Sequence, residues 1–186
     1  MHEDWELHQV DIVGAYLQGD LNEEIYMEVL EGVKEKGKEG WCWKLMKALY
    51  GLKQVGHQWK KKLDEILGKL SLKKSQADNC LYICHEDGIV ALLVLAYVDN
   101  MVVAGKNIAH VREFKKNIAR HMEITDLGEL HYILGIQIKC DHTARTISLN
   151  QTAYICDVLE RFGMENSNPV SMPLNTKGRL SAAQSP

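Results

Sequence analysis

Two aspartates of this sequence, Asp11 and Asp99, are the side chains best placed by type and context to do chemistry. Each stands at the end of a run of residues that favours β-structure, and a strand end is a rigid anchor for a ligand. Carboxylate oxygens are the ligands that Mg²⁺ prefers, and the ion takes its other ligands from water and substrate phosphates. Such pairs of aspartates are also common as solvated turn residues, so the two acids alone predict no function.

The segments around the two aspartates predict strands and a hairpin tip. Residues 5–15 alternate in part and lead into a turn at 18–20, which places Asp11 near a strand end. Residues 80–84 and 89–94 favour β-structure and are joined by Asp87-Gly88, a common hairpin turn. The second run continues to the polar pair Asp99-Asn100 before apolar residues resume, so this pair is predicted at the tip of a further hairpin.

The remaining segments predict three amphipathic helices and two further β-regions. The helices are predicted where apolar residues recur at three- and four-residue spacing, over residues 57–70, 108–122 and 151–162. The other elements are a short strand at 22–28, a loop at 31–40, a helical turn at 45–50, and a hairpin of 132–140 with 146–149. The predicted fold class is therefore α+β, with an antiparallel sheet and helices packed on one face.

Composition limits the class of protein. The chain of 186 residues, 46% of them hydrophobic, is long enough to bury one core. The longest apolar stretch, residues 89–98, is too short to span a bilayer, and the first residues lack the features of a secretory signal, so we expect an intracellular protein. Five cysteines without a Cys-x-x-Cys pair predict reduced packing residues.

The charge distribution bears on nucleic-acid binding. A net charge of −3 argues against contact with nucleic acid over the whole surface, because phosphates must be neutralised by lysine and arginine. Charge is nevertheless segregated along the chain, which leaves room for a local basic patch. The lysines that predict this patch are Lys60, Lys61, Lys62, Lys69, Lys73 and Lys74.

Several short motifs occur in one order over most of the chain. The first is Val-Asp-Ile-Val-Gly-Ala-Tyr-Leu-Gln-Gly at residues 10–19, the second Ala-Leu-Tyr-Gly-Leu-Lys-Gln at 48–54, and the third Tyr-Val-Asp-Asn at 97–100. Shorter matches follow at Asp126-Leu127-Gly128 and Leu134-Gly135-Ile136, and again within residues 149–171. In this order they resemble the polymerase region of the Pol polyprotein of copia-like LTR retrotransposons, whose reverse transcriptase has Tyr-Val-Asp-Asp at the third motif.

The resemblance implies a right-hand polymerase palm over residues 1–140, with 141–186 as the end of the palm and the start of a thumb or connection, followed by an irregular tail. It implies synthesis of DNA on RNA or DNA templates, with Mg²⁺ as the cofactor and Mn²⁺ as its substitute. The implied partners are a template-primer, deoxynucleotides, and the fingers, thumb and ribonuclease H parts of a polyprotein, with no membrane. The implied locations are cytoplasmic particles and the nucleus.

The resemblance also assigns roles to individual residues. Asp11 and Asp99, with the backbone carbonyl of Ile12, would bind the metal ions, and Tyr16 would be the steric gate against a ribose 2′-hydroxyl. Lys53 and Gln54 would line the incoming nucleotide or template. Three further residues, Tyr97, Leu134 and Gly135, would contact the primer or template. For these three residues, and for Tyr16, Lys53 and Gln54, simple packing is the alternative role.

Two departures from the family pattern keep a second reading open. Asn100 stands where the family has its second catalytic aspartate, so the shape and one acceptor oxygen are kept and the negative charge is lost. Val55-Gly56-His57 replaces a Ser/Ala-Pro-Arg string. The sequence therefore predicts either an impaired reverse transcriptase core or a catalytically dead palm relic that binds nucleic acid or protein; an unrelated α+β domain is the third reading.

Overall fold

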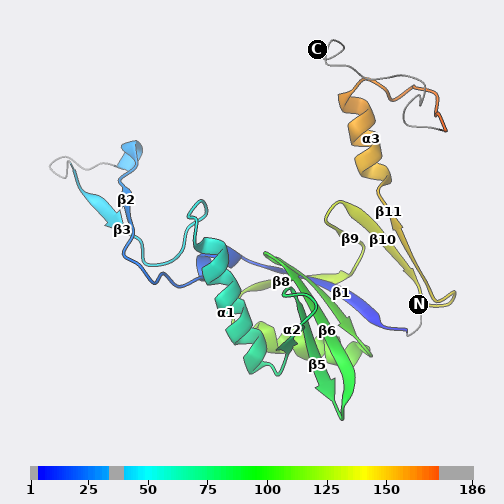
Figure 1. Ribbon diagram of the computed structural model, residues 1–186, viewed down its shortest axis with the longest axis horizontal. Coiled ribbons are helices and arrows are strands. Elements are labelled where there is room, and N and C mark those ends of the chain that lie inside the picture. The colour runs from blue at the N-terminus through cyan, green and yellow to red at the C-terminus, as the bar shows by residue number, and fades with distance from the viewer. Residues whose placement is uncertain (1–3, 34–39, 172–186) are drawn as a thin grey trace.

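The computed structural model describes residues 4–33 and 40–171 (Figure 1). Its centre is a six-stranded sheet with the order β4-β5-β6-β7-β1-β8, in which all paired neighbours run antiparallel. The strands are β1 (Glu6–Ile12), β4 (Lys73–Lys74), β5 (Leu81–Glu86), β6 (Ile89–Tyr97), β7 (Asn100–Gly105) and β8 (Ile124–Glu129). The first strand of the chain thus lies inside the sheet, between two strands that come much later.

Local turn chemistry builds the β5-β6-β7 meander. Asp87 and Gly88 join β5 to β6 and both have positive φ, 52° and 78°, as a type I′ turn requires. Val98 and Asp99 join β6 to β7, so the polar pair predicted at a hairpin tip does lie there. These two of the three hairpin predictions are confirmed.

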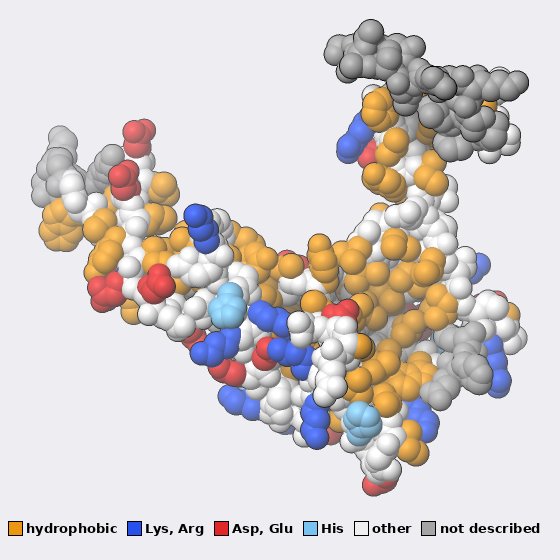
Figure 2. Space-filling model, in the orientation of Figure 1, with side chains coloured by type: hydrophobic (Ala, Val, Ile, Leu, Met, Phe, Trp, Pro, Cys, Tyr) orange, Lys and Arg blue, Asp and Glu red, His pale blue; other side chains and the backbone are white. Residues whose placement is uncertain are grey.

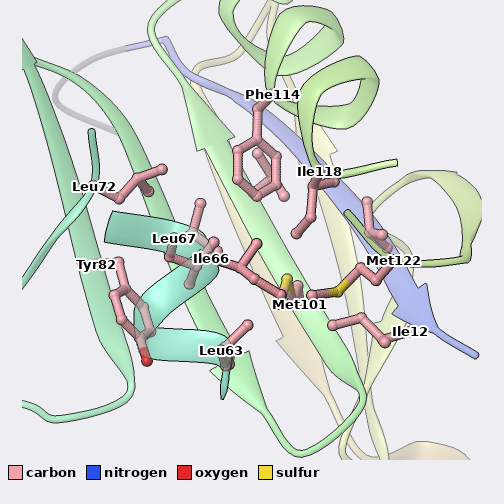
Figure 3. Packing of buried hydrophobic residues seen from close by; sticks show 14 of the residues in the cluster. Ile12, Leu63, Ile66, Leu67, Leu72, Tyr82, Met101, Phe114, Ile118 and Met122 are labelled. Carbon is pink, nitrogen blue, oxygen red and sulfur yellow. The ribbon is translucent and has the colours of Figure 1, made fainter. Parts of the chain in front are cut away.

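Two helices, α1 (Val55–Lys69) and α2 (Ile108–Ile118), pack on one face of this sheet (Figures 1 and 3). Their apolar stripes meet the side chains that alternate strand residues point toward them, because successive side chains of a strand face opposite ways. The buried cluster includes Ile12, Leu63, Leu67, Tyr82, Met101, Phe114 and Ile118. The predicted α+β class with an antiparallel sheet is confirmed.

Two smaller parts extend from the main sheet (Figure 1). One is an arm made by β2 (Tyr26–Glu28) and β3 (Cys42–Lys44), with the short 3₁₀ helix η2 (Glu31–Val33). A second 3₁₀ helix, η1 (Ala15–Gln18), packs against α1 and belongs to the main core. The other part is a three-stranded sheet of β9 (Tyr132–Ile133), β10 (Ile136–Asp141) and β11 (Thr146–Asn150), followed by α3 (Thr152–Arg161). Helix α3 buries none of its residues, and its hydrophobic side chains lie at the surface (Figure 2).

Three details of the sequence prediction are wrong. Residues 45–50 form bends and a turn instead of a helical turn. The reason is that β3 pairs with β2, and Leu45 N, just after β3, extends this pairing by donating a hydrogen bond to Ile25 O over 2.8 Å. The strand predicted over 132–140 is split into β9 and β10 by a turn at Leu134 and Gly135. Strands β3, β4 and β8 were not predicted. Part of the predicted loop, 34–39, and the tail 172–186 lie outside the described residues.

Leu67 provides a test of this core. Its side chain is 0% exposed, so we expect Leu67→Ala to lower the free energy of unfolding by about 2–5 kcal/mol through lost burial and a residual cavity. The matched control is Leu149→Ala in β11, where the leucine is 63% exposed and we expect a change within about 0.5 kcal/mol. Urea unfolding followed by circular dichroism measures both, and equal losses would contradict the core assignment.

Candidate active site

The pairing of β1 with β7 brings Asp11 and Asp99 together. Asp11 lies opposite Asn100 in the strand register, and Ile12 N donates to Asp99 O over 2.8 Å. Because Val10 and Ile12 point into the helix-covered core, Asp11 points to the opposite face of the sheet. The two aspartates are therefore neighbours at the end of one hairpin although 88 positions separate them in the sequence.

The electrostatics of the pair suit a cation. Partial burial raises the pKa of Asp11 above its ordinary value, and the negative charge of Asp99 raises it further. Each of two neighbouring carboxylates makes ionisation of the other less favourable, and a divalent cation between them stabilises both in the ionised form. Within residues 4–33 and 40–171, no group of three or more His, Cys, Asp or Glu side chains is arranged to hold a metal ion. A pair of carboxylates nevertheless suffices for Mg²⁺ when phosphates supply further ligands.

Asn100 is held by two side-chain hydrogen bonds. Gln9 Nε2 donates to Asn100 Oδ1 over 2.9 Å, and Asn100 Nδ2 donates to Asp99 Oδ1 over 3.3 Å. Gln9 is only 9% exposed, which makes it one of the few buried polar side chains of the described chain. Sequence reasoning missed Gln9, because a single glutamine in a strand carries no pattern that distinguishes it from a surface residue.

Helix α1 holds the turn that carries Asp99. Trp59 is 3% exposed, and its Nε1 donates to Val98 O over 2.7 Å. Val98 has a φ of 57°, a left-handed conformation that a β-branched residue adopts only at a cost. Trp59 is thus part of the core, and its indole also fixes the strained turn beside the aspartate.

The structure places the predicted nucleotide residue Tyr16 near this turn. Tyr16 lies in η1, with its ring 5.0 Å from that of Tyr50 between centroids. Together with Trp59 and Val98 it lines a cavity of about 170 Å³. The phenol ring is therefore held beside the β6-β7 turn.

The other predicted site residues are distributed over three elements. Tyr97 pairs with Asn100 at the end of β6 and is 55% exposed. Lys53 and Gln54 directly precede α1, where Gln54 is the N-cap residue, and Leu134 and Gly135 form the β9-β10 turn. Across the described ranges, no hydrogen bond or ion pair joins these last four residues to Asp11 or Asp99.

The predicted basic patch is partly neutralised. Lys60 and Lys74 both pair with Asp64, at 3.2 and 2.5 Å, and Lys62 pairs with Asp20 at 2.8 Å. Burial opposes ionisation of Asp64, but hydrogen bonds, those from Lys74 and Lys60 included, hold the pKa of its carboxyl below its ordinary value. Figure 2 shows basic side chains beside acidic ones around α1. The Lys74–Asp64 pair joins α1 to β4, and the Lys62–Asp20 pair joins α1 to the loop after η1. Together the pairs leave less free positive charge than the sequence suggested.

The Asp126-Leu127-Gly128 motif has a structural place on β8. Asp126 accepts a hydrogen bond from Lys115 of α2 and another, over 2.9 Å, from Gly128 N. Burial alone would raise the pKa of Asp126, but these interactions outweigh it and the pKa is lowered. Lys115 also contacts His8 Nδ1 over 2.9 Å. The motif thus joins α2 to β8 and β1, the strand that carries Asp11.

Comparison with known proteins shows the family to which the chain belongs. The family model described as "Reverse transcriptase (RNA-dependent DNA polymerase)" matches residues 1–176, so the chain belongs to the reverse transcriptase family. Among curated proteins it is 39% identical, over 98% of its length, to the Retrovirus-related Pol polyprotein from transposon TNT 1-94 of Nicotiana tabacum. It is 33% identical over 95% of its length to the corresponding polyprotein from transposon RE1 of Arabidopsis thaliana. The resemblance inferred from the motifs is thereby confirmed.

The relatives are much longer than this chain. It spans 14% of the tobacco polyprotein, 12% of the Arabidopsis one, and 10% of the Transposon Ty1-MR1 Gag-Pol polyprotein of Saccharomyces cerevisiae, to which it is 31% identical. No solved structure matches the chain significantly. None of the helices in the described parts of the chain is long and apolar enough to cross a membrane.

Trp59→Phe tests the link between α1 and the turn. We expect a loss of about 0.5–1.5 kcal/mol in the free energy of unfolding, because the indole hydrogen bond to Val98 O disappears while the aromatic packing stays. The control is Trp43→Phe on β3, where the side chain is exposed and we expect no measurable loss. Denaturant titration of both variants checks this, and an unchanged midpoint for Trp59→Phe would show that the bond contributes nothing.

Proposed function

We propose that this chain is the palm of an RNA-directed DNA polymerase of a copia-like retrotransposon, which adds deoxynucleotides to a primer by nucleotidyl transfer with two Mg²⁺ ions. The observation that carries the proposal is the adjacency of Asp11 and Asp99 across the β1-β7 pair, at a hairpin tip on the sheet face away from α1 and α2. Membership of the reverse transcriptase family supports the same reading.

In this proposal the chain's own groups hold and orient the reactants. Asp11, Asp99 and the backbone carbonyl of Ile12 bind the divalent ions, and the bond from Ile12 N to Asp99 O keeps the two carboxylates in register. When bound, the ions would lower the pKa of the primer 3′-hydroxyl and neutralise charge on the leaving pyrophosphate. The raised pKa of Asp11 supports an affinity of this pair for positive charge.

The remaining proposed contacts position the nucleotide and the primer. Tyr16, fixed against Tyr50, would exclude the 2′-hydroxyl of a ribonucleotide. Lys53 and Gln54 would contact the phosphates of the incoming deoxynucleotide or the template. Lysine binds phosphate as a point charge, and Lys53 is exposed just before α1.

The primer contacts would come from Tyr97 and from the turn at Leu134 and Gly135. Tyr97 is exposed next to Asn100. The turn residues both have positive φ, 51° and 77°, which gives a tight bend whose backbone can approach a strand closely.

The domain division is part of the proposal. Residues 1–140 would form the palm and 141–186 the end of the palm and the start of a thumb or connection, with the fingers, thumb and ribonuclease H parts supplied by a longer polyprotein. Two observations support this: the chain spans a small share of its Pol polyprotein relatives, and α3 buries no residue in the main core.

The second candidate function is a catalytically dead palm that binds nucleic acid or protein. Asn100 favours it, since the amide cannot supply the negative charge that holds a divalent cation. The loss of one such contact with the transition state costs on the order of a hundredfold in rate. The two candidates therefore differ in whether restoring that charge restores activity.

Primer extension on a poly-rA template, with Mg²⁺ and separately with Mn²⁺, tests the proposal. We expect weak extension by the natural chain, a gain on the order of a hundredfold for Asn100→Asp because a metal-binding charge returns, and no extension for Asp99→Asn. The matched control is Asp87→Asn, the same change at the tip of the β5-β6 hairpin, where asparagine suits the turn and activity should be unchanged.

Two results decide between the candidates. Extension that survives Asp99→Asn would refute the metal assignment. Silence of the Asn100→Asp variant with both metals, in a chain that still unfolds cooperatively, would favour the dead palm.

A further inference from the structure

Gln9 is a buried amide next to the proposed metal ligands. It precedes Asp11 by two residues on β1, so the alternation of a strand puts both side chains on the same face of the sheet. At 9% exposure, its amide would be costly to bury without partners, and its Nε2 meets Asn100 Oδ1 at 2.9 Å. This hydrogen bond links β1 to β7 at the position where the chain departs from its family.

The direction of the Gln9–Asn100 bond is set by Asp99. An ionised carboxylate only accepts hydrogen bonds, so Asn100 turns its NH₂ group to Asp99 Oδ1, 3.3 Å away. The oxygen of Asn100 then points the other way, toward Gln9, which must also present NH₂. If both amides were flipped, Asn100 Oδ1 would face an oxygen of Asp99 with no proton between them, and this arrangement is disfavoured.

An amide has one oxygen, whereas a carboxylate has two. With asparagine at position 100, the bond from Gln9 holds the single side-chain oxygen turned toward Gln9, and the NH₂ group faces Asp99. An aspartate there would give one oxygen to Gln9 and keep the other for a metal ion. We infer that Gln9 is a positioning residue that keeps Asn100 Oδ1 turned away from Asp99 and from a metal ion there, which leaves Asp11 and Asp99 as the side-chain ligands of the site.

This inference rests on the proposed function in one respect, namely that Asp11 and Asp99 bind a divalent cation. It adds a second reason for weak metal binding. The chain lacks a charge at position 100, and the neutral oxygen that remains there is turned toward Gln9. Outer-shell partners of this kind tune metal affinity by orienting or occupying the groups around the ion.

The test is the affinity for Mn²⁺, measured from the electron paramagnetic resonance signal of the free ion. The chains compared are the natural one, Gln9→Met, Asn100→Asp and the double variant; Met is close to Gln in length and offers no amide. We expect Gln9→Met to tighten Mn²⁺ binding several-fold in the natural chain, because Asn100 becomes free to turn its oxygen to the ion. In the Asn100→Asp background it should not tighten binding, because the second carboxylate oxygen is already available.

The control substitution is Gln137→Met in β10, an exposed glutamine that should leave the Mn²⁺ affinity unchanged. Failure of Gln9→Met to tighten binding in the natural chain, or equal tightening in both backgrounds, would overturn the inference. Absence of Mn²⁺ binding in all four chains would overturn both this inference and the proposed metal site. Silent primer extension together with the expected binding pattern would overturn the polymerase proposal alone.

A measurement on the natural chain keeps the inference testable if Gln9→Met does not fold. We expect the side-chain NH₂ protons of Gln9 and Asn100 to exchange with water more slowly in NMR spectra than those of Gln137, since the first two are hydrogen-bonded and shielded. Exchange of the Gln9 protons as fast as those of Gln137 would show that no such bond persists, and the inference would fall.

Discussion

The antiparallel pairing of β1 with β7 is the interaction on which the candidate site depends. It sets Asp11 opposite Asn100, while Val10, Ile12 and Met101 on the other face are buried under the helices. A slip by one residue would turn Asp11 into the apolar core and expose Val10 and Ile12, because side chains alternate along a strand. The hydrophobic core therefore enforces the register, and the register places the carboxylates. Substitutions in this core would disturb the site without touching it.

The β6-β7 turn illustrates how the surroundings hold an unfavourable conformation in place. A left-handed β-branched residue such as Val98 costs on the order of 1–3 kcal/mol, and it persists only where neighbouring contacts determine the backbone. Here those contacts come from Trp59 on α1 and from Ile12 on β1, each through one hydrogen bond to a turn carbonyl. Asp99 is thus fixed from two sides. Such local strain is typical of sites that bind ligands.

The sequence predicted the turns and helices that depend on neighbouring residues. It did not predict the features that depend on pairing between residues far apart in the chain. Asp87-Gly88 and the stripe of α1 are local signals, and both elements formed as expected. Strand β8 lacks clear alternation, and it forms because β1 offers an edge and Lys115 pairs with Asp126. The adjacency of Asp11 to Asp99 came from the family resemblance, since no periodicity links residues so far apart. The role of Gln9 was not predicted because its hydrogen-bond partner, Asn100, lies 91 residues later in the sequence.

The position of β1 inside the sheet also has a consequence for the order of folding. This strand is synthesised before the other strands of its sheet, yet its partners β7 and β8 begin at Asn100 and Ile124. At ribosomal rates of about 5–20 residues per second, β1 waits roughly 5–20 s for β7 to be made, with both of its edges unpaired. Closing so long a loop is a late, slow step. A substitution that delays the β5-β6-β7 meander would therefore prolong the interval in which the nascent chain can aggregate through β1.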